Sequence, residues 1–269
     1  MTEFGLCLWT FGDLTFEEKC KKASEIGVEG VEVKGDLSID PTELKKILTK
    51  YNLKALSVTP DNMDISSLDE TIRQEAVDYF LNLVDWAKEI GADRFCLHGK
   101  VGVIELDTTY EEHYKLLLNS TQKIVDKASS VEMPIVYEVL NRYENYIMLT
   151  AKEAKRLIND VGSQYLTILL DAYHMNIEES DTLEALALAG GDLGVYHIAD
   201  SNSQGIGNGH SNLLEQLDKL KELNYTGPII MEMTAEGPNP FTPVKEGDYL
   251  SVLTEYYKQS LTVLKKKFN

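Results

Sequence analysis

Four residues able to bind a metal ion follow short apolar segments in the second half of the chain: Glu138, Asp171, His197 and Glu232. They are separated by 33, 26 and 35 residues. If those segments are consecutive parallel strands of a barrel, their carboxyl ends converge on one mouth. Three carboxylates and one imidazole would repel each other there and be costly to bury unless a cation neutralised them. Three oxygen donors and one nitrogen, without a thiolate, favour Mn²⁺, Mg²⁺ or Co²⁺ over a closed structural zinc site.

The rest of the sequence predicts the elements that must position these residues. Short apolar segments alternate with segments of helical periodicity along the whole chain. We predict strands over residues 4–9, 30–33, 54–58, 94–97, 134–139, 166–171, 194–198 and 228–233. We predict helices over residues 16–26, 41–51, 69–90, 110–129, 150–160, 183–189, 211–223 and 247–267. Eight strand–helix units of roughly 33 residues predict an α/β fold, a single (β/α)8 TIM barrel spanning residues 1–269 as one domain.

An open doubly wound sheet is the alternative fold for such an alternation. That fold would require a glycine-rich phosphate-binding turn after the first strand. The sequence at residues 8–13, LWTFGD, is not such a turn. The barrel is therefore the favoured architecture.

Composition restricts the partners. The chain has 26 basic and 44 acidic residues, a formal charge of −18 that argues against nucleic acid. It has no apolar run of about 18 residues, so we expect no membrane span. The start of the sequence lacks the basic and apolar regions of a secretory signal, so we expect a cytoplasmic protein. The scattered Cys7, Cys20 and Cys96 are predicted to be buried free thiols.

The residues around the four ligands resemble the xylose-isomerase-like sugar isomerase/epimerase family, especially its ketose 3-epimerases, which act on tagatose and allulose. The resemblance is carried by EVLNRYE (138–144), DAYHMNIE (171–178), HIADSN (197–202) and the strand-end glutamate. It implies Mn²⁺ or Co²⁺ bound by Glu138, Asp171, His197 and Glu232. It also implies that the two glutamates exchange the C3 proton of a ketose from opposite faces. By the same resemblance, Glu144 and His174 hold substrate hydroxyls.

The chemistry agrees with that reading. Removal of a proton next to a ketone requires stabilisation of the enediolate, which a metal on the ketone oxygen supplies. Epimerisation needs a base on one face and an acid on the other. We therefore expect a metal-dependent epimerase or isomerase acting on a ketose or related keto-sugar. The metal-dependent C-glycoside deglycosidases, lyases that act on 3-keto-glycosides by elimination, are the alternative function.

The match to the ketose 3-epimerases fails at Ser203, where those enzymes usually carry an arginine that grips the substrate. A short neutral side chain predicts a roomier, less cationic pocket that suits a larger or glycosylated substrate. His98, at the end of the fourth predicted strand, could contact substrate, lie near the metal or be structural. Trp9, near the end of the first, could stack on a sugar or pack.

The remaining segments and function classes have less specific signals in the sequence. The glycine-rich residues 204–210 are predicted to be a turn rather than a phosphate site. The loop at residues 233–243 holds three of the seven prolines and could form a wall of the pocket or contact a partner chain. That partner would be a second copy of the protein, in a homo-oligomer, or a different subunit. Endonuclease IV, a DNA-repair relative with a trinuclear zinc site, uses more than the five histidines present. A sugar-binding or structural protein would not need all four ligands.

Overall fold

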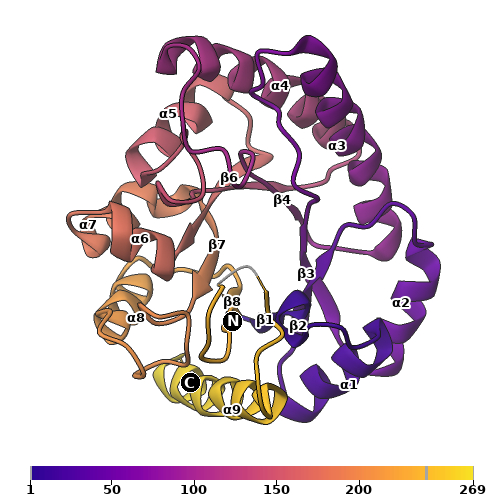
Figure 1. The fold of residues 1–269 in the computed structure, drawn as a ribbon, viewed down its shortest axis with the longest axis vertical. Helices are drawn as coiled ribbons and strands as arrows, with labels where there is room; N and C mark the ends of the chain where they lie inside the picture. Colours follow the sequence, from indigo (N-terminus) through magenta and orange to yellow (C-terminus); the bar gives the residue numbers. More distant parts are fainter. Residues whose placement is uncertain (1, 240–241, 269) are drawn as a thin grey trace.

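The structure, a computed structural model, describes residues 2–239 and 242–268. Eight parallel strands of this part form one sheet in the order β3-β2-β1-β8-β7-β6-β5-β4, with the helices around it (Figure 1). The strands are β1 (Phe4–Cys7), β2 (Gly30–Lys34), β3 (Lys54–Thr59), β4 (Phe95–Leu97), β5 (Ile135–Glu138), β6 (Leu166–Asp171), β7 (Leu193–Ile198) and β8 (Ile229–Met231).

The outermost strands of this order, β3 and β4, lie next to each other. The backbone N–H of Asp93, just before β4, donates to the carbonyl of Ala55 in β3 at 3.0 Å. This link brings the sheet round to a nearly closed ring. The predicted (β/α)8 barrel is confirmed.

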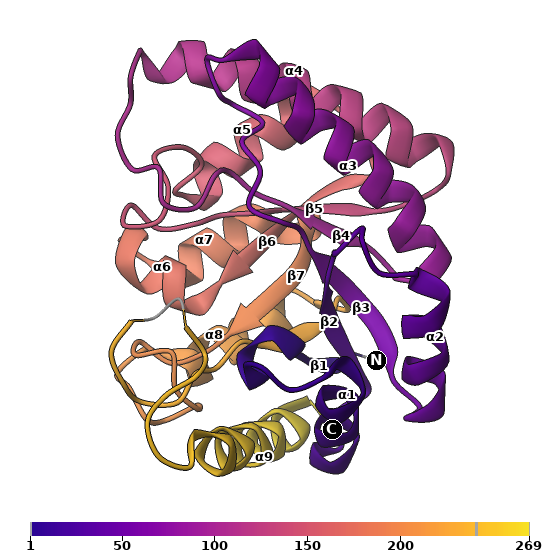
Figure 2. The ribbon, with the colours of Figure 1, turned by 45° about the vertical axis from the view of Figure 1, so that its right-hand side comes forward.

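The helices surround the strands and cover their outer face. They are α1 (Phe16–Ile26), α2 (Pro41–Lys50), α3 (Glu70–Ile90), α4 (Tyr110–Ser130), α5 (Ala151–Val161), α6 (Ala172–Glu178), α7 (Thr182–Ala189), α8 (Leu213–Glu222) and α9 (Tyr249–Phe268). Helix α9 lies beside α1 and completes the outer layer (Figure 2). Capping boxes at Thr15, Thr109 and Thr150 fix where α1, α4 and α5 begin. None of the described helices is long and apolar enough to cross a membrane.

The structure differs from the prediction in two places. The first strand ends at Cys7 rather than at residue 9, and a 3-10 turn, η1 (Leu8–Phe11), follows it. The Thr10 hydroxyl donates to the Cys7 carbonyl at 2.8 Å and holds this turn. Helix α6, which was not among the predicted helices, follows β6 directly, and the Asp171 carboxylate caps it by accepting from the N–H groups of Tyr173 and His174.

The interior of the barrel explains why the four strand-end residues face inward. Side chains two positions apart lie on the same face of a strand. Two residues before the four ligands stand buried aliphatic residues that pack together inside the barrel with Cys7, Leu56 and Cys96: Val136, Leu169, Val195 and Ile230. The same alternation therefore directs the next inward-facing side chains to the mouth. The three cysteines are buried and free, as predicted.

Candidate active site

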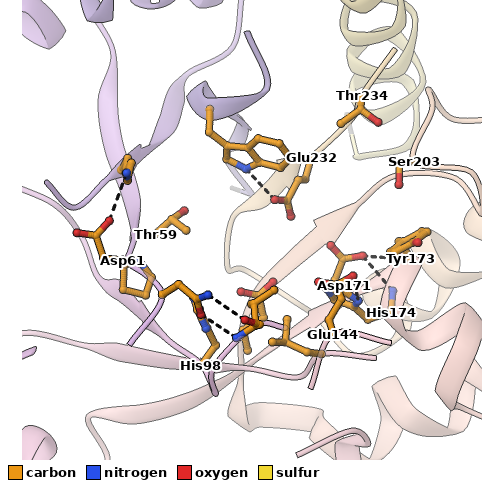
Figure 3. Close-up of a pocket in the computed structure, with 17 residues that line it drawn as sticks. Thr59, Asp61, His98, Glu144, Asp171, Tyr173, His174, Ser203, Glu232 and Thr234 are labelled. Carbon is orange, nitrogen blue, oxygen red and sulfur yellow. Dashed lines mark hydrogen bonds and ion pairs between the residues drawn. The ribbon is translucent and has the colours of Figure 1, made fainter. Parts of the chain in front are cut away.

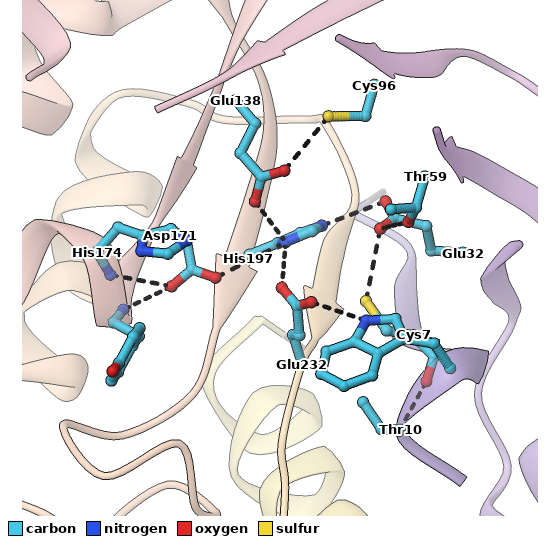
Figure 4. A network of polar contacts seen from close by, with 12 residues as sticks. Cys7, Thr10, Glu32, Thr59, Cys96, Glu138, Asp171, His174, His197 and Glu232 are labelled. Atoms are coloured by element: carbon cyan, nitrogen blue, oxygen red, sulfur yellow. Dashed lines mark hydrogen bonds and ion pairs between the residues drawn. The ribbon is translucent and has the colours of Figure 1, made fainter. Parts of the chain in front are cut away.

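Strands β5 to β8 bring the four predicted ligands together. Their potential ligand atoms all lie within 4.8 Å of one another. The Nδ1 atom of His197 lies 2.9 Å from a carboxylate oxygen of Glu232, 3.7 Å from Asp171 and 3.8 Å from Glu138. Figure 4 shows the imidazole between the three carboxylates. The spacing seen in the sequence thus corresponds to one compact cluster.

The electrostatics of the cluster fit a divalent cation. Burial raises the pKa of Glu138 well above its usual range, and the neighbouring carboxylates of Glu232, Glu32 and Asp171 raise it further. Burial likewise raises the pKa of Asp171. Carboxyl groups so placed do not ionise together without positive charge, which a bound divalent cation would supply.

Cys7 also lies close enough to His197 and Glu232 to form a three-residue group with metal-ligand geometry. Burial raises the pKa of its thiol well above the ordinary value, and the nearby Glu232 and Glu32 reinforce the shift. A thiol binds a metal as the thiolate, whereas the Cys7 thiol donates to a carboxylate oxygen of Glu32 at 3.6 Å. The oxygen-rich set at the barrel mouth therefore fits a cation better.

Glu32, on β2, is a site residue that the sequence reasoning missed. Its carboxylate is buried and accepts from Nε2 of His197 at 3.2 Å and from the hydroxyl of Thr59 at 2.5 Å. Burial would raise the pKa of Glu32, but the charge and hydrogen bond of His197 lower it to about 2. Burial lowers the pKa of His197, but Glu32 and Glu232 outweigh that effect and raise it well above its usual value. Nε2 is thus hydrogen-bonded on one side, and Nδ1 faces the predicted ligands.

Further contacts fix the two glutamates. The indole N–H of Trp9 donates to Glu232 at 2.8 Å, and the thiol of Cys96 donates to Glu138 at 3.4 Å. Trp9 reaches this position because η1 follows β1 directly. Its indole therefore holds a carboxylate as well as lining the pocket.

Glu144 and His174 share one partner that the sequence reasoning also missed. The side-chain amide of Asn141 donates to Glu144 at 2.8 Å and to Nδ1 of His174 at 2.7 Å. Because that nitrogen accepts, the Nε2 atom of neutral His174 carries the proton. Arg142, a potential partner of Glu144, pairs with Glu178 instead at 2.8 Å. Glu144 therefore keeps its place in the pocket wall.

The cluster lies in a pocket of about 460 Å³. Eight of the nine predicted site residues line it. The ninth, His197, is buried beneath the three carboxylates of the cluster. Figure 3 shows the pocket with His98 and Asp61 on one side and Ser203 and Thr234 on the other. Burial lowers the pKa of His98, and its Nδ1 atom lies 2.7 Å from the Gly99 carbonyl. His98 is thus a neutral wall residue outside the ligand cluster.

The glycine-rich residues 204–210 wrap around a carboxylate of the chain itself. The backbone N–H groups of Gly207 and Ser211 donate to Asp200 at 2.9 and 3.0 Å. Those donors are therefore already used, and a turn is the better description. Ser203 begins this segment with a left-handed backbone, φ +60°, and its N–H donates to the Asp200 carbonyl at 2.8 Å.

Known proteins are similar to this chain in both sequence and fold. The D-psicose 3-epimerase of Agrobacterium fabrum is 39% identical over 109 residues, 40% of this chain, and the chain spans only 38% of that relative. The 3-dehydro-D-guloside 4-epimerase of Escherichia coli is 24% identical over 83% of this chain and 88% of its own length. The crystal structure of D-allulose 3-epimerase from Methylomonas sp. matches with a TM-score of 0.88 and 25% identity, covering 99% of this chain and 98% of that one. The model of the family described as xylose isomerase-like TIM barrel matches residues 20–266. The chain belongs to this family.

Proposed function

We propose that this protein is a divalent-metal-dependent sugar epimerase that moves a proton on a carbon next to a ketone. C3 epimerisation of a ketose is the reaction best supported. The observation that carries the proposal is the arrangement of two glutamates, at the ends of β5 and β8, on either side of Asp171 and His197 from β6 and β7 between them. Relatives that epimerise ketoses or a 3-dehydro-guloside support the same class of chemistry.

The residues that would hold the cation are Glu138, Asp171, His197 and Glu232. Their donor set suits Mn²⁺ best, with Co²⁺ or Mg²⁺ as alternatives. The bound cation would polarise the ketone and stabilise the negative charge that develops as the α proton leaves.

Proton transfer is assigned to Glu138 and Glu232. One carboxylate oxygen accepts the C3 proton, and the carboxylic acid of the other glutamate returns a proton to the opposite face of the carbon. In the reverse direction the roles exchange. Glu144 and His174 hold substrate hydroxyls during both half-reactions.

The reaction class can be tested by solvent exchange. Mn²⁺-loaded protein is incubated in D₂O with allulose, fructose and tagatose, and deuterium on the carbon next to the ketone is followed by NMR. We expect uptake together with formation of the C3 epimer, both abolished by a chelator and restored by Mn²⁺. Release of a leaving group from a 3-keto-C-glycoside would instead identify the lyase alternative. No uptake into any keto-sugar by the metal-loaded protein would contradict the proposal.

Glu32 is proposed as a positioning residue for His197. Replacing it with Leu removes the acceptor of the Nε2 proton, and loss of such a partner lowers metal affinity by about 10- to 100-fold. Glu32→Gln keeps an acceptor oxygen and should therefore lose less metal affinity than Glu32→Leu. Mn²⁺ affinity is measured by calorimetry and by the electron paramagnetic resonance signal of the free ion. Glu17→Gln, at a surface pair with Lys50, is the control, and wild-type affinity in folded Glu32→Leu protein would refute the role.

A further inference from the structure

A second cavity of about 430 Å³ adjoins the pocket. Three residues line both: Tyr173, Ser203 and Thr234. Figure 3 places them at the side of the pocket away from Asp61 and His98. The two cavities therefore meet at these three side chains, and this meeting point is called the passage below.

The boundary between the cavities is held in place. The backbone N–H of Thr234, in the loop after β8, donates to the carbonyl of Ser203 at 2.7 Å. This bond ties the loop after β8 to the loop after β7. Ser203 presents a short side chain at the passage, where a long side chain would separate the two cavities.

Each of the three boundary residues carries a hydroxyl group. Within the part of the chain that the structure describes, none of these hydroxyls makes a hydrogen bond to another residue. Other polar groups of the second cavity are already paired: Gln204 accepts from Tyr256 at 3.1 Å, and Asn202 donates to the carbonyl of Asn208 at 2.9 Å. The hydroxyls of Tyr173, Ser203 and Thr234 are not among the fully buried side-chain atoms without a partner, so they are accessible from the cavities. Three free hydroxyls around one passage thus provide donors and acceptors for a ligand that runs through it.

The charges of the second cavity favour a neutral ligand over an anionic one. Its one cation among the described lining residues, Lys245, donates to the carbonyls of Pro238 and Asn239 at 2.8 and 2.6 Å. The exposed carboxylate of Glu236 adds negative charge. A phosphate would be repelled by the carboxylate of Glu236, and the ammonium group of Lys245 is already hydrogen-bonded to carbonyls. Hydroxyl groups and the half-buried ring of Tyr173 suit a sugar, which presents both polar edges and apolar faces.

We propose that the substrate is a two-ring keto-sugar: the ring or open chain bearing the ketone lies at the cluster, and a second, uncharged sugar unit occupies the second cavity. The hydroxyls of Tyr173, Ser203 and Thr234 contact the region where the two units join. This inference rests on the proposed epimerase function and names its substrate class.

The test compares one-ring and two-ring substrates in the D₂O exchange assay. The probes are fructose, allulose and tagatose against isomaltulose, lactulose, trehalulose and a 3-keto-trehalose, all with Mn²⁺-loaded protein. We expect kcat/KM for at least one two-ring compound to exceed that of every monosaccharide by tenfold or more. If a free ketose is used as efficiently as all two-ring compounds, the second subsite is refuted while the epimerase stands. If no compound exchanges deuterium, the epimerase proposal itself fails.

Substitutions at the passage test whether the preference for two-ring substrates depends on the second cavity. Ser203→Arg places a long cationic side chain across the passage and should lower the two-ring to one-ring ratio of kcat/KM by at least tenfold. Thr234→Val removes one hydroxyl with little change of shape and should lower the same ratio by about three- to tenfold. Thr254→Val on α9 is the matched control, because its hydroxyl donates to the Leu250 carbonyl and lines neither cavity. An unchanged ratio in both pocket variants would overturn the assignment of the second cavity.

Discussion

Glu138→Gln and Glu232→Gln should each lower turnover by about 10² to 10⁴, which is roughly 3 to 5 kcal/mol of barrier. Each substitution removes a proton-transfer group yet keeps an oxygen that can still touch the metal. Steady-state rates and Mn²⁺ content are measured on the same preparations, so that loss of chemistry is separated from loss of metal.

The two variants should also differ in which epimer still exchanges its proton with solvent. With one glutamate missing, the other can still take its proton from one epimer and return it to the same face. Deuterium uptake should then survive for one epimer while net inversion is lost, and the favoured epimer should switch between the variants. Glu144→Gln, which leaves both proton-transfer groups in place, is the comparison. Near-normal turnover in both metal-loaded Gln variants would mean that the glutamates are ligands only.

The sequence predicted the barrel and the clustering of four strand-end residues because both follow from local regularities. Strand and helix periods alternate along the chain, and parallel strands in such a series converge at their carboxyl ends. A strand-end side chain two residues after an inward aliphatic residue must also face inward, as Glu232 does after Ile230. These relations need only spacing and strand alternation, without knowledge of distant contacts.

The residues that the sequence reasoning missed depend on contacts across the barrel. Glu32 stands in the apolar segment GVEVK, and an acid inside a buried strand is itself a signal of a paired charge. Its partner, however, is His197 on the other half of the chain, which spacing alone does not indicate. Asn141 lies inside the motif EVLNRYE, but its bonds to Glu144 and His174 depend on where α6 begins. The 3-10 turn at Leu8–Phe11 was likewise not predicted, because the apolar segment of the sequence continues past the end of β1.

Asp171→Asn should abolish metal binding and turnover while the barrel stays folded. The amide keeps an oxygen that can accept from the N–H groups at the start of α6, so the cap survives. It removes one negative charge from a crowded buried cluster, so the metal-free variant should unfold at the same temperature as metal-free wild type or above it. Metal analysis after dialysis and thermal unfolding with a chelator provide the two measurements. Full Mn²⁺ occupancy in Asp171→Asn would remove Asp171 from the ligand set.

His197→Ala should lose the metal as completely as Asp171→Asn does. The stability of the two metal-free variants should differ, however. The imidazole is the hydrogen-bonded partner of the buried Glu32 at 3.2 Å, so its removal leaves a buried carboxylate uncompensated, at a cost of about 3 to 5 kcal/mol. The metal-free variant should therefore unfold at a clearly lower temperature than Asp171→Asn. Combining His197→Ala with Glu32→Leu should restore much of the lost stability without restoring Mn²⁺ binding, because the unpaired charge is removed but the ligand is not. If the double variant is no more stable than His197→Ala alone, the pairing of Glu32 with His197 does not account for the loss.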